Sequence, residues 1–480
     1  MSNTKRDPRP ARLTLAASAG LALVLGSDPA LAGAAHDRTP IRAAESYATI
    51  EAFQAPLAAW PSDGWWTELG DPQLDQLMNE GLADAADIRA AVARFDRANA
   101  MAGAARSRLA PTVEGQAQAG SEKQTYNYLM PSEAVPQGWN DAGRAGLNFA
   151  WELDFWGKNR AALQAAKLDA QAAGAEAASA RLAVSTGIAA AYADLARLYT
   201  ELDTLDDAVS IRGRTVAVMA KRNAQGLENI GAVERAKAAQ AAAESERAAL
   251  NELIVLTKHR IAALMGAGPD RGLAIQRPMI ILADNLGLPR NVPAGLLGRR
   301  ADVTAARLRA EAAASRIKQA KAGFYPNVNL VGMIGVQSLG LGNLLNSGSD
   351  YGSVGPAVSL PIFNGGRLKA EHRGAEADYA AAVANYDGTL TQALREVADV
   401  TTSVRALDER LGRALEAEAH AEAAWKVANN RYAGGLATYL DVLTAEDALV
   451  ASRRTVAQHQ TRAFTLHVAL VRALGGGFHA

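Results

Sequence analysis

The histidine residues are the first candidates for chemistry, because imidazole binds divalent metals and exchanges protons near neutral pH. They are scattered through the chain, and only His459 and His467 share an expected helix, eight positions apart and without a third ligand. No Ser-His-Asp order, phosphate-binding loop or close pair of carboxylates stands out. We therefore expect no enzyme, no cofactor and no metal site. The other histidines are His36, His259, His372, His420 and His479.

The composition excludes further classes of protein. Cysteine is absent, so disulfides, thiolate metal sites and lipid attachment through cysteine are excluded. Basic and acidic residues balance at 50 each, which leaves no electrostatic footprint for nucleic acid. Alanine dominates and aromatic residues make up 5% of the chain. This composition favours long helices over a compact α/β enzyme.

The N-terminus has the pattern of a secretory leader. Basic residues between 5 and 12 precede the apolar stretch 13–26, and residues 30–32 read Ala-Leu-Ala. We expect a signal peptide over 1–32, cleaved after Ala32. The alternative is a short membrane anchor, but a spanning helix needs about 20 apolar residues and no later segment offers them. If the mature chain enters a membrane, it must do so as a closed β-barrel.

Two similar halves follow. Three motifs recur at one constant offset: Gly157-Lys158 with Gly366-Arg367, 222–227 with 431–436, and 264–266 with 473–475. Chance similarity of alanine-rich helices would explain the shared composition, but not glycines held in register. We expect an extended N-terminal segment over 33–70, a first repeat over 71–270 and a second over 271–480.

Each half carries two segments of loose alternation between turn residues. We place strands at about 111–130 and 142–153 in the first half, and at about 326–338 and 350–363 in the second. A length of about ten residues suits a membrane strand. Ordinary surface hairpins would show the same pattern.

Long helices give the clearer signal. No proline occurs from 158 to 223, and Val184, Ile188 and Tyr192 begin a series at helical spacing. Gly226 and Gly435 mark turns, so we expect helical hairpins over 157–266 and 366–475. At 1.5 Å per residue, the first helix of each approaches about 100 Å.

Four strands are too few to close a barrel, because single-chain membrane barrels have about eight or more. Open sheet edges are excluded from lipid, so several chains must share one barrel. The predicted fold is mainly α: long helical hairpins forming an α-barrel tunnel, a shared transmembrane β-barrel with four strands per protomer, and two internal repeats. A soluble coiled coil is the alternative, although it leaves the strand segments unexplained.

One stretch carries a specific resemblance. Residues 291–303 read NVPAGLLGRRADV, similar to the P-x-x-L-L-x-R-R-P-D-I motif of the TolC-like outer membrane efflux proteins. Within that family the chain resembles the nodulation protein T group, the outer membrane factors of RND efflux pumps. Ala301 replaces the usual proline. The match extends from about residue 60 to 475, and its signature positions are Leu296, Leu297, Arg299, Arg300, Asp302, Pro326 and Gly366.

The resemblance implies a homotrimer whose twelve strands surround a pore that continues into a helical tunnel. It implies a passive conduit for small toxic molecules in the outer membrane of a Gram-negative bacterium, in contact with outer-membrane lipid. Its partners would be a periplasmic adaptor and an inner-membrane transporter of the RND type, with no nucleic acid. The group is commonly lipidated, but Ala34 stands where the acylated cysteine would lie, so we expect no lipid anchor. The competing functions are a conduit for type I protein secretion and a non-channel coiled coil of the envelope.

The resemblance also assigns roles at the hairpin turns. Asp441 matches an acidic ring at the closed periplasmic mouth, and Tyr432 matches a tyrosine of the gating network; the alternative for Asp441 is a solvated carboxylate at a helix start. The family's arginine and second acid are replaced by Ala437 and Thr444. The halves differ here, so we expect aperture control in the second half.

Short glycine-leucine motifs occupy both hairpin tips. Gly226, Leu227, Gly435 and Leu436 resemble the family's adaptor-contact tips. The alternative is that glycine serves only the tight turn. An exposed leucine beside it is the odder feature, because a tip leucine has no core to enter.

Overall fold

The computed structural model of the chain describes residues 41–279 and 287–479. The expected signal peptide, 1–32, lies outside the described residues. Between 41 and 70 the backbone forms two short 3-10 helices, η2 (Ala44–Ser46) and η3 (Trp65–Leu69). A parallel bridge also joins Leu57 to Leu288.

The first half contains five helices and two strands in the described residues: α1 (Pro72–Asp84), α2 (Ala86–Ser107), β1 (Thr112–Glu122), β2 (Asn140–Glu152), α3 (Lys158–Ala224), α4 (Ile230–Leu264) and α5 (Pro269–Leu273). The described part of the second half contains α6 (Val292–Arg299), α7 (Ala301–Ala322), β3 (Asn327–Leu339), β4 (Asp350–Ser359), α8 (Arg367–Ala433) and α9 (Tyr439–Leu474). β1 ends well before residue 130, because the chain turns there into a loop with the short helix η4 (Ser132–Ala134).

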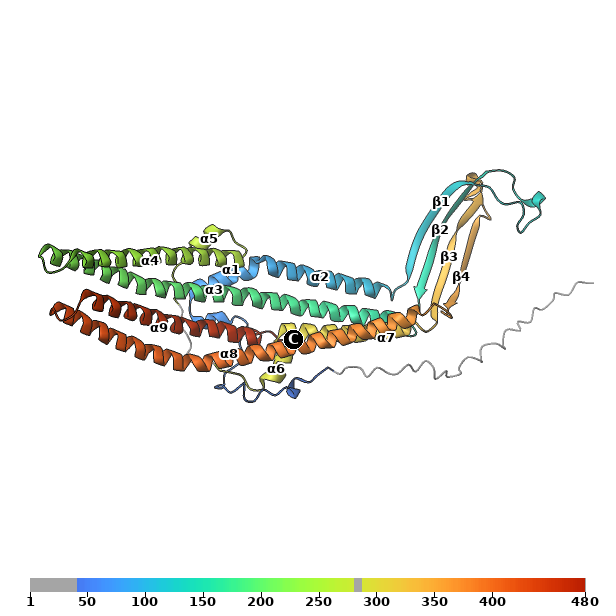
Figure 1. Cartoon of the computed structure of the whole chain (residues 1–480). Coiled ribbons are helices and arrows are strands. Elements are labelled where there is room, and N and C mark those ends of the chain that lie inside the picture. The colour runs from blue at the N-terminus through green and yellow to red at the C-terminus, as the bar shows by residue number, and fades with distance from the viewer. Residues whose placement is uncertain (1–40, 280–286, 480) are drawn as a thin grey trace, which may run out of the picture. The chain divides into compact units, whose positions relative to one another are not determined.

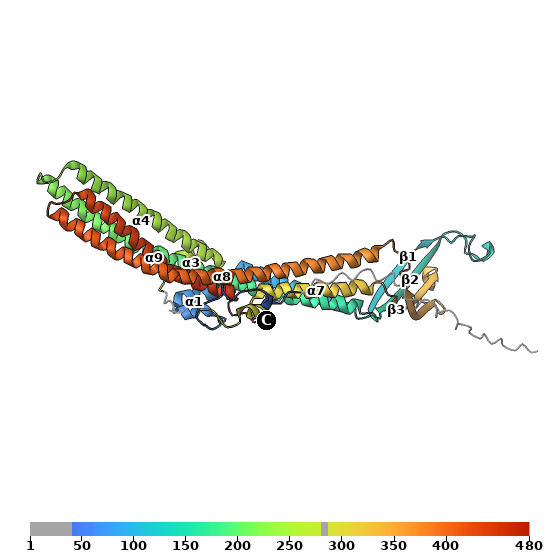
Figure 2. The same cartoon turned by 60° about the horizontal axis from the view of Figure 1, so that its bottom comes forward.

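The two longest helices have equal lengths. α3 and α8 each contain 67 residues, which corresponds to about 100 Å of helix. Each begins after a left-handed glycine, with φ of 75° at Gly157 and 86° at Gly366. The hairpins α3–α4 and α8–α9 extend side by side away from the sheet (Figures 1 and 2).

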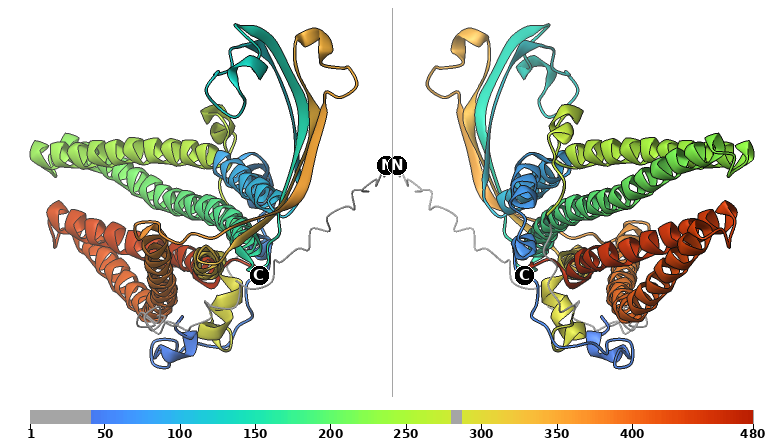
Figure 3. Two further views of the ribbon diagram at one scale, coloured as in Figure 1. Left: turned by 90° about the vertical axis from the view of Figure 1, so that its right-hand side faces the viewer. Right: turned by 90° about the vertical axis from the view of Figure 1, so that its left-hand side faces the viewer.

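The helices pack in two rows that share α3 and α8. Near the hairpin turns the order is α4–α3–α9–α8, and nearer the sheet it is α2–α3–α7–α8. Figure 1 shows both rows from the side, and Figure 3 shows them from their ends. Each row therefore ends in a first-half helix on one side and in α8 on the other.

The main hydrophobic core lies where the two rows meet. η3 and α1 pack there on α3, α4 and α9, with Trp65, Met78, Ile188 and Tyr192 fully buried. The Tyr192 hydroxyl donates to Asp71 Oδ2 at 2.6 Å, and Asp71 also caps α1 by accepting from Gln73 N. The short N-terminal helices thus clamp the long ones midway along their length.

The four strands form one antiparallel sheet in the order β1-β2-β3-β4, with β1 and β4 as edges. The register sorts the side chains onto two faces, since successive residues of a strand point to opposite sides. One face carries Val, Leu, Ile, Phe and Trp with small residues between them. The apolar face includes Val113, Leu147, Phe149, Trp151, Val328, Leu330, Ile334, Val354 and Val358.

The opposite face of the sheet is mostly polar. It carries Glu114, Gln116, Gln118, Arg144, Asn148, Asn329, Gln337 and Ser353. The larger apolar or aromatic side chains on this face are Val331, Met333, Leu339 and Tyr351. The separation is clearer across the sheet than along any one strand, because glycine and alanine interrupt the alternation within each strand.

The predicted fold is confirmed: the chain is mainly α, with long helical hairpins, a small antiparallel sheet and two similar halves. Within the described residues, every helix is too short or too polar to cross a bilayer.

Candidate functional site

The hairpin turns present exposed apolar side chains. Gly226 and Gly435 have φ of 70° and 75°, and a Cβ on either would meet nothing within 4 Å. The need for glycine is therefore conformational. Leu227 and Leu436 are 63% and 73% exposed, so each turn carries an apolar side chain with no core to enter.

Sequence reasoning missed the second apolar residue at each turn. Ile230 and Leu440, in the first turn of α4 and α9, are 62% and 56% exposed. Their signal was a further apolar residue within four positions of each tip leucine. Each hairpin end thus offers a pair of exposed aliphatic side chains.

Tyr432 lies among residues of the first hairpin. Its hydroxyl donates to Glu228 Oε2 at 3.1 Å and lies 3.2 Å from Met219 Sδ. The Arg222 guanidinium sits 4.9 Å from the centre of its ring. Burial, and then the bond to Glu228, raise the pKa of Tyr432, so its hydroxyl remains a donor at neutral pH.

These contacts of Tyr432 come from the other half of the chain. Among them is Arg222, an arginine at a different position from Ala437, the residue that replaces the family's arginine. The partners of Tyr432 thus tie the second hairpin to the first, and both halves contribute to the contacts of this residue.

Arg212 forms a second connection between the hairpins, and sequence reasoning missed it. Its Nε lies 3.3 Å from Glu446 Oε1, its Nη2 pairs with Asp447, and its Nη1 donates to Ala239 O at 3.0 Å. Burial raises the pKa of Glu446 despite the opposing effect of Arg212. Glu446 and burial together raise the pKa of Tyr439 to about 12. The available signal was a charged residue within an otherwise apolar helix face.

Asp441 is part of a capping box at the start of α9. Its Oδ2 accepts from Thr438 N and Thr438 Oγ1, both at 2.8 Å. The backbone bond, followed by the hydroxyl bond, lowers the pKa of Asp441 below 3.8. Asp441 is therefore ionised at neutral pH. Among the described residues, no hydrogen bond joins Asp441 to Tyr432.

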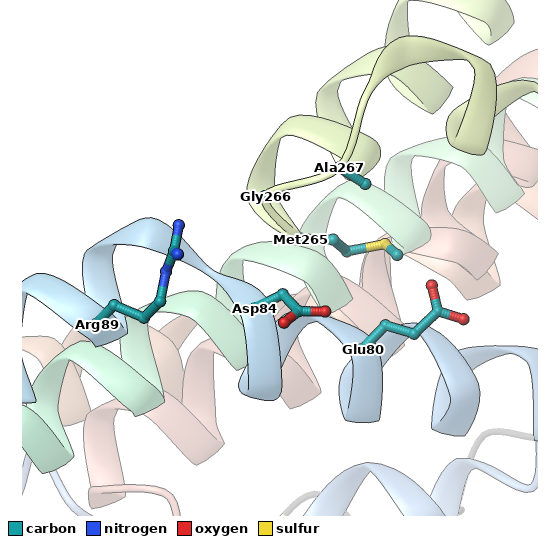
Figure 4. A pocket seen from close by; sticks show the side chains of 6 residues that line it. All are labelled: Glu80, Asp84, Arg89, Met265, Gly266 and Ala267. Carbon is teal, nitrogen blue, oxygen red and sulfur yellow. The ribbon is translucent and has the colours of Figure 1, made fainter.

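Two cavities open between the helices. One, of about 340 Å³, lies between α1, α2 and the end of α4 (Figure 4). Its Glu80 already accepts from Arg271 and Gln76. The other, of about 290 Å³, lies between α3, α8 and α9 and is bounded by Tyr432, Tyr439 and Glu446. In the described residues no group of three His, Asp or Glu could hold a metal.

The family signature forms a structural joint. Arg300 is buried, and its guanidinium bonds to Asp302 Oδ2 and Glu396 Oε2, both at 2.6 Å, and to Ala473 O at 3.2 Å. Leu296 is fully buried beside it, and Leu297 is partly buried. Arg300 therefore joins α6, α7, α8 and the end of α9.

The remaining signature residues also have structural contacts. Arg299 stacks 4.9 Å from the Trp60 ring. The carbonyl of Pro326 accepts from Trp156 Nε1 at 2.8 Å, which fastens the start of β3 to the end of β2. Gly366 provides the left-handed entry to α8. None of these signature residues borders either cavity.

Comparison with known proteins gives one consistent answer. The sequence profile of the family described as "Outer membrane efflux protein" matches residues 77–267 and 292–476. The chain is 29% identical to the multidrug resistance outer membrane protein MdtP of Escherichia coli K12, over 88% of each protein. It is 37% identical to the fusaric acid resistance protein FusA of Burkholderia cepacia, over 65% of this chain and 60% of FusA.

Solved structures agree with the sequence relatives. The outer membrane protein VceC of Vibrio cholerae superposes with a TM-score of 0.83 and 47% identity, over 88% of this chain and all of VceC. The outer-membrane channel OprN gives a TM-score of 0.83 at 28% identity, over 92% and 98%. The chain therefore belongs to the outer membrane efflux protein family and functions as an efflux channel of the outer membrane.

Proposed function

We propose that the chain is one protomer of a homotrimer that forms the passive outer-membrane conduit of a tripartite efflux pump. The observation that supports this proposal is that the sheet and both helix rows end in two unlike open edges. The sheet ends in β1 and β4. The helix row nearer the sheet ends in α2 and α8, and the row near the hairpin turns ends in α4 and α8. Contacts between unlike edges are heterologous, and they generate rings when the rotation closes.

The two faces of the sheet fit such a ring. Copies joined between β1 and β4 would leave no unpaired strand edge, as lipid requires. The apolar face would then contact outer-membrane lipid, and the polar face would line a water-filled path. The family assignment removes the alternative of a non-channel coiled coil.

The cargo is proposed to be small toxic molecules. The names of the relatives FusA and MdtP, which refer to fusaric acid resistance and to multidrug resistance, support this class. No nucleotide-binding loop was found in the sequence, so the energy would come from an inner-membrane transporter, of RND type by resemblance. A conduit for protein secretion remains the second candidate.

Planar-bilayer recording tests the channel proposal. Purified protein should run as a heat-resistant trimer and give discrete conductance steps, and deletion of the gene should sensitise cells to several small toxic compounds. Monomeric protein without steps would contradict the trimeric conduit. Loss of one exported protein without any change in drug sensitivity would favour the secretion candidate.

The intact mass of the same purified protein tests whether the chain is cleaved after Ala32 and whether it carries a lipid.

The exposed aliphatic pairs at the hairpin ends are proposed to bind the periplasmic adaptor. Leu436→Glu and Leu227→Glu should each weaken adaptor binding about tenfold. Each substitution replaces an apolar contact, worth about 1–2 kcal/mol of binding free energy, with a charged side chain. Binding is measured by surface plasmon resonance on purified trimers.

The matched control is Leu345→Glu, because Leu345 is 88% exposed in the loop between β3 and β4 at the sheet. It should leave adaptor binding unchanged. Equal binding by all three variants would contradict the adaptor role, and loss of the trimer would indicate a structural role instead.

A further inference from the structure

The four strands contain a single basic residue, Arg144 in the middle of β2. The register pairs it with Gln118 on β1 and with Gln337 on β3. All three side chains are exposed on the polar face. A guanidinium flanked by two amides forms one row of hydrogen-bond donors across three adjacent strands, about 4.8 Å apart.

The charge of Arg144 is not neutralised within the chain. In the described residues it forms no ion pair or hydrogen bond. On the same face, Glu114 and Glu122 lie four positions from Gln118 in either direction along β1. At about 3.4 Å per residue this is about 14 Å, beyond the screening length of about 8 Å at physiological ionic strength.

The next acid on the polar face is already paired. Glu152 lies eight positions from Arg144 on β2, and Lys158 Nζ is 3.0 Å from its Oε1. The polar face therefore has one isolated positive level between two negative ones. In a closed ring of copies, that level becomes a ring of guanidinium groups.

We propose that Arg144 is a specificity-determining residue of the conduit, which attracts anions and the carboxylate or phosphate groups of cargo to the row Gln118–Arg144–Gln337. The inference rests on the proposed function, because the polar face must line the aqueous path. Rings of arginine or lysine favour anions in pores, and guanidinium matches the planar geometry of carboxylate. The role differs from that of Asp441, which lies at the opposite end of the long helices.

The test is the reversal potential of single channels in a KCl gradient. Arg144→Gln replaces the charge with the amide found on both neighbouring strands, and Arg144→Glu reverses it. The permeability ratio of K⁺ to Cl⁻ should rise about fivefold in the first variant, because one charge across about 8 Å of water changes each permeability about twofold, in opposite directions for K⁺ and Cl⁻. It should rise further in the second.

Each variant is also made with Asp441→Asn, so that the charge at the hairpin ends does not mask the sheet. Lys123→Gln is the matched control, since Lys123 lies just beyond β1 against the Tyr126 ring, outside the polar face. It should leave the ratio unchanged.

An unchanged ratio in Arg144→Glu, in both backgrounds, would overturn the inference while the channel itself is retained. Absence of conductance in the unaltered protein would instead overturn the proposed function. If Arg144→Glu fails to assemble, the permeability ratios of Arg144→Gln and Arg144→Lys are compared instead. Lysine should keep the original ratio and glutamine should raise it, so equal ratios in the two variants would overturn the inference.

Discussion

Replacing Arg300 with alanine should lower the free energy of unfolding by about 3 kcal/mol. The guanidinium is the common partner of Asp302, Glu396 and the Ala473 carbonyl. Removing it leaves both carboxylates without an ion-pair partner, although Val303 N and Gln392 still donate to them. Breaking a fully buried pair costs about 3–5 kcal/mol. The lower end applies because Asp302 and Glu396 are 42% and 30% exposed.

Chemical denaturation in detergent measures this effect, with Arg299→Ala as the control. Arg299 lies beside Arg300 but stacks on Trp60 at the surface, so its loss should cost about 1 kcal/mol or less. Arg300→Lys should be intermediate, because an ammonium cannot donate in a fork to one carboxylate. Equal destabilisation by Arg299→Ala and Arg300→Ala would contradict the joint.

The same joint predicts sensitivity to acid. Burial alone would raise the pKa of Asp302, but the bonds from Arg300 outweigh it and hold this pKa below the ordinary value of 3.8. A lowered pKa contributes stability above the unfolded-state value, and this contribution is lost as the pH falls through the folded-state value. The unaltered protein should therefore lose stability below about pH 4 more steeply than Arg300→Ala.

Neutralising Asp441 should raise single-channel conductance severalfold and reduce the preference for cations. In the proposed trimer, three Asp441 carboxylates would surround the periplasmic mouth. Such a ring attracts cations, and hydrogen bonds and ion pairs can hold the mouth closed. Because the bonds from Thr438 lower its pKa, Asp441 remains charged throughout the neutral range. Conductance in planar bilayers tests the effect.

The capping box requires a particular choice of variants. Asp441→Asn removes the charge but keeps an oxygen that can accept from Thr438 N, whereas Thr438→Ala removes the capping hydroxyl and keeps the charge. A gate role predicts altered conductance in Asp441→Asn and little change in Thr438→Ala. A role limited to the helix start predicts unchanged conductance in Asp441→Asn. It predicts that Thr438→Ala lowers the free energy of unfolding by about 1 kcal/mol, the cost of a lost cap.

Local sequence was sufficient for much of the fold. The hairpins followed from helical periodicity and from Gly226 and Gly435, because these signals lie within a few residues of one another. The signature at 291–303 identified the family for the same reason. The start of the loop after β1 was wrongly assigned to the strand, since residues 123–130 contain tyrosine, threonine and leucine, which are common in strands, and no glycine or proline marks the turn.

The contacts between these elements were evident only from the tertiary structure. The two faces of the sheet appear only when four weakly alternating strands are placed in register. Tyr432 finds Glu228, and Arg300 finds Glu396, across spans of 204 and 96 residues. Periodicity reports which face of a segment is buried, but not which distant segment covers it. That choice depends on packing among long helices, where many alanine-lined faces are equivalent and a few charged pairs distinguish them.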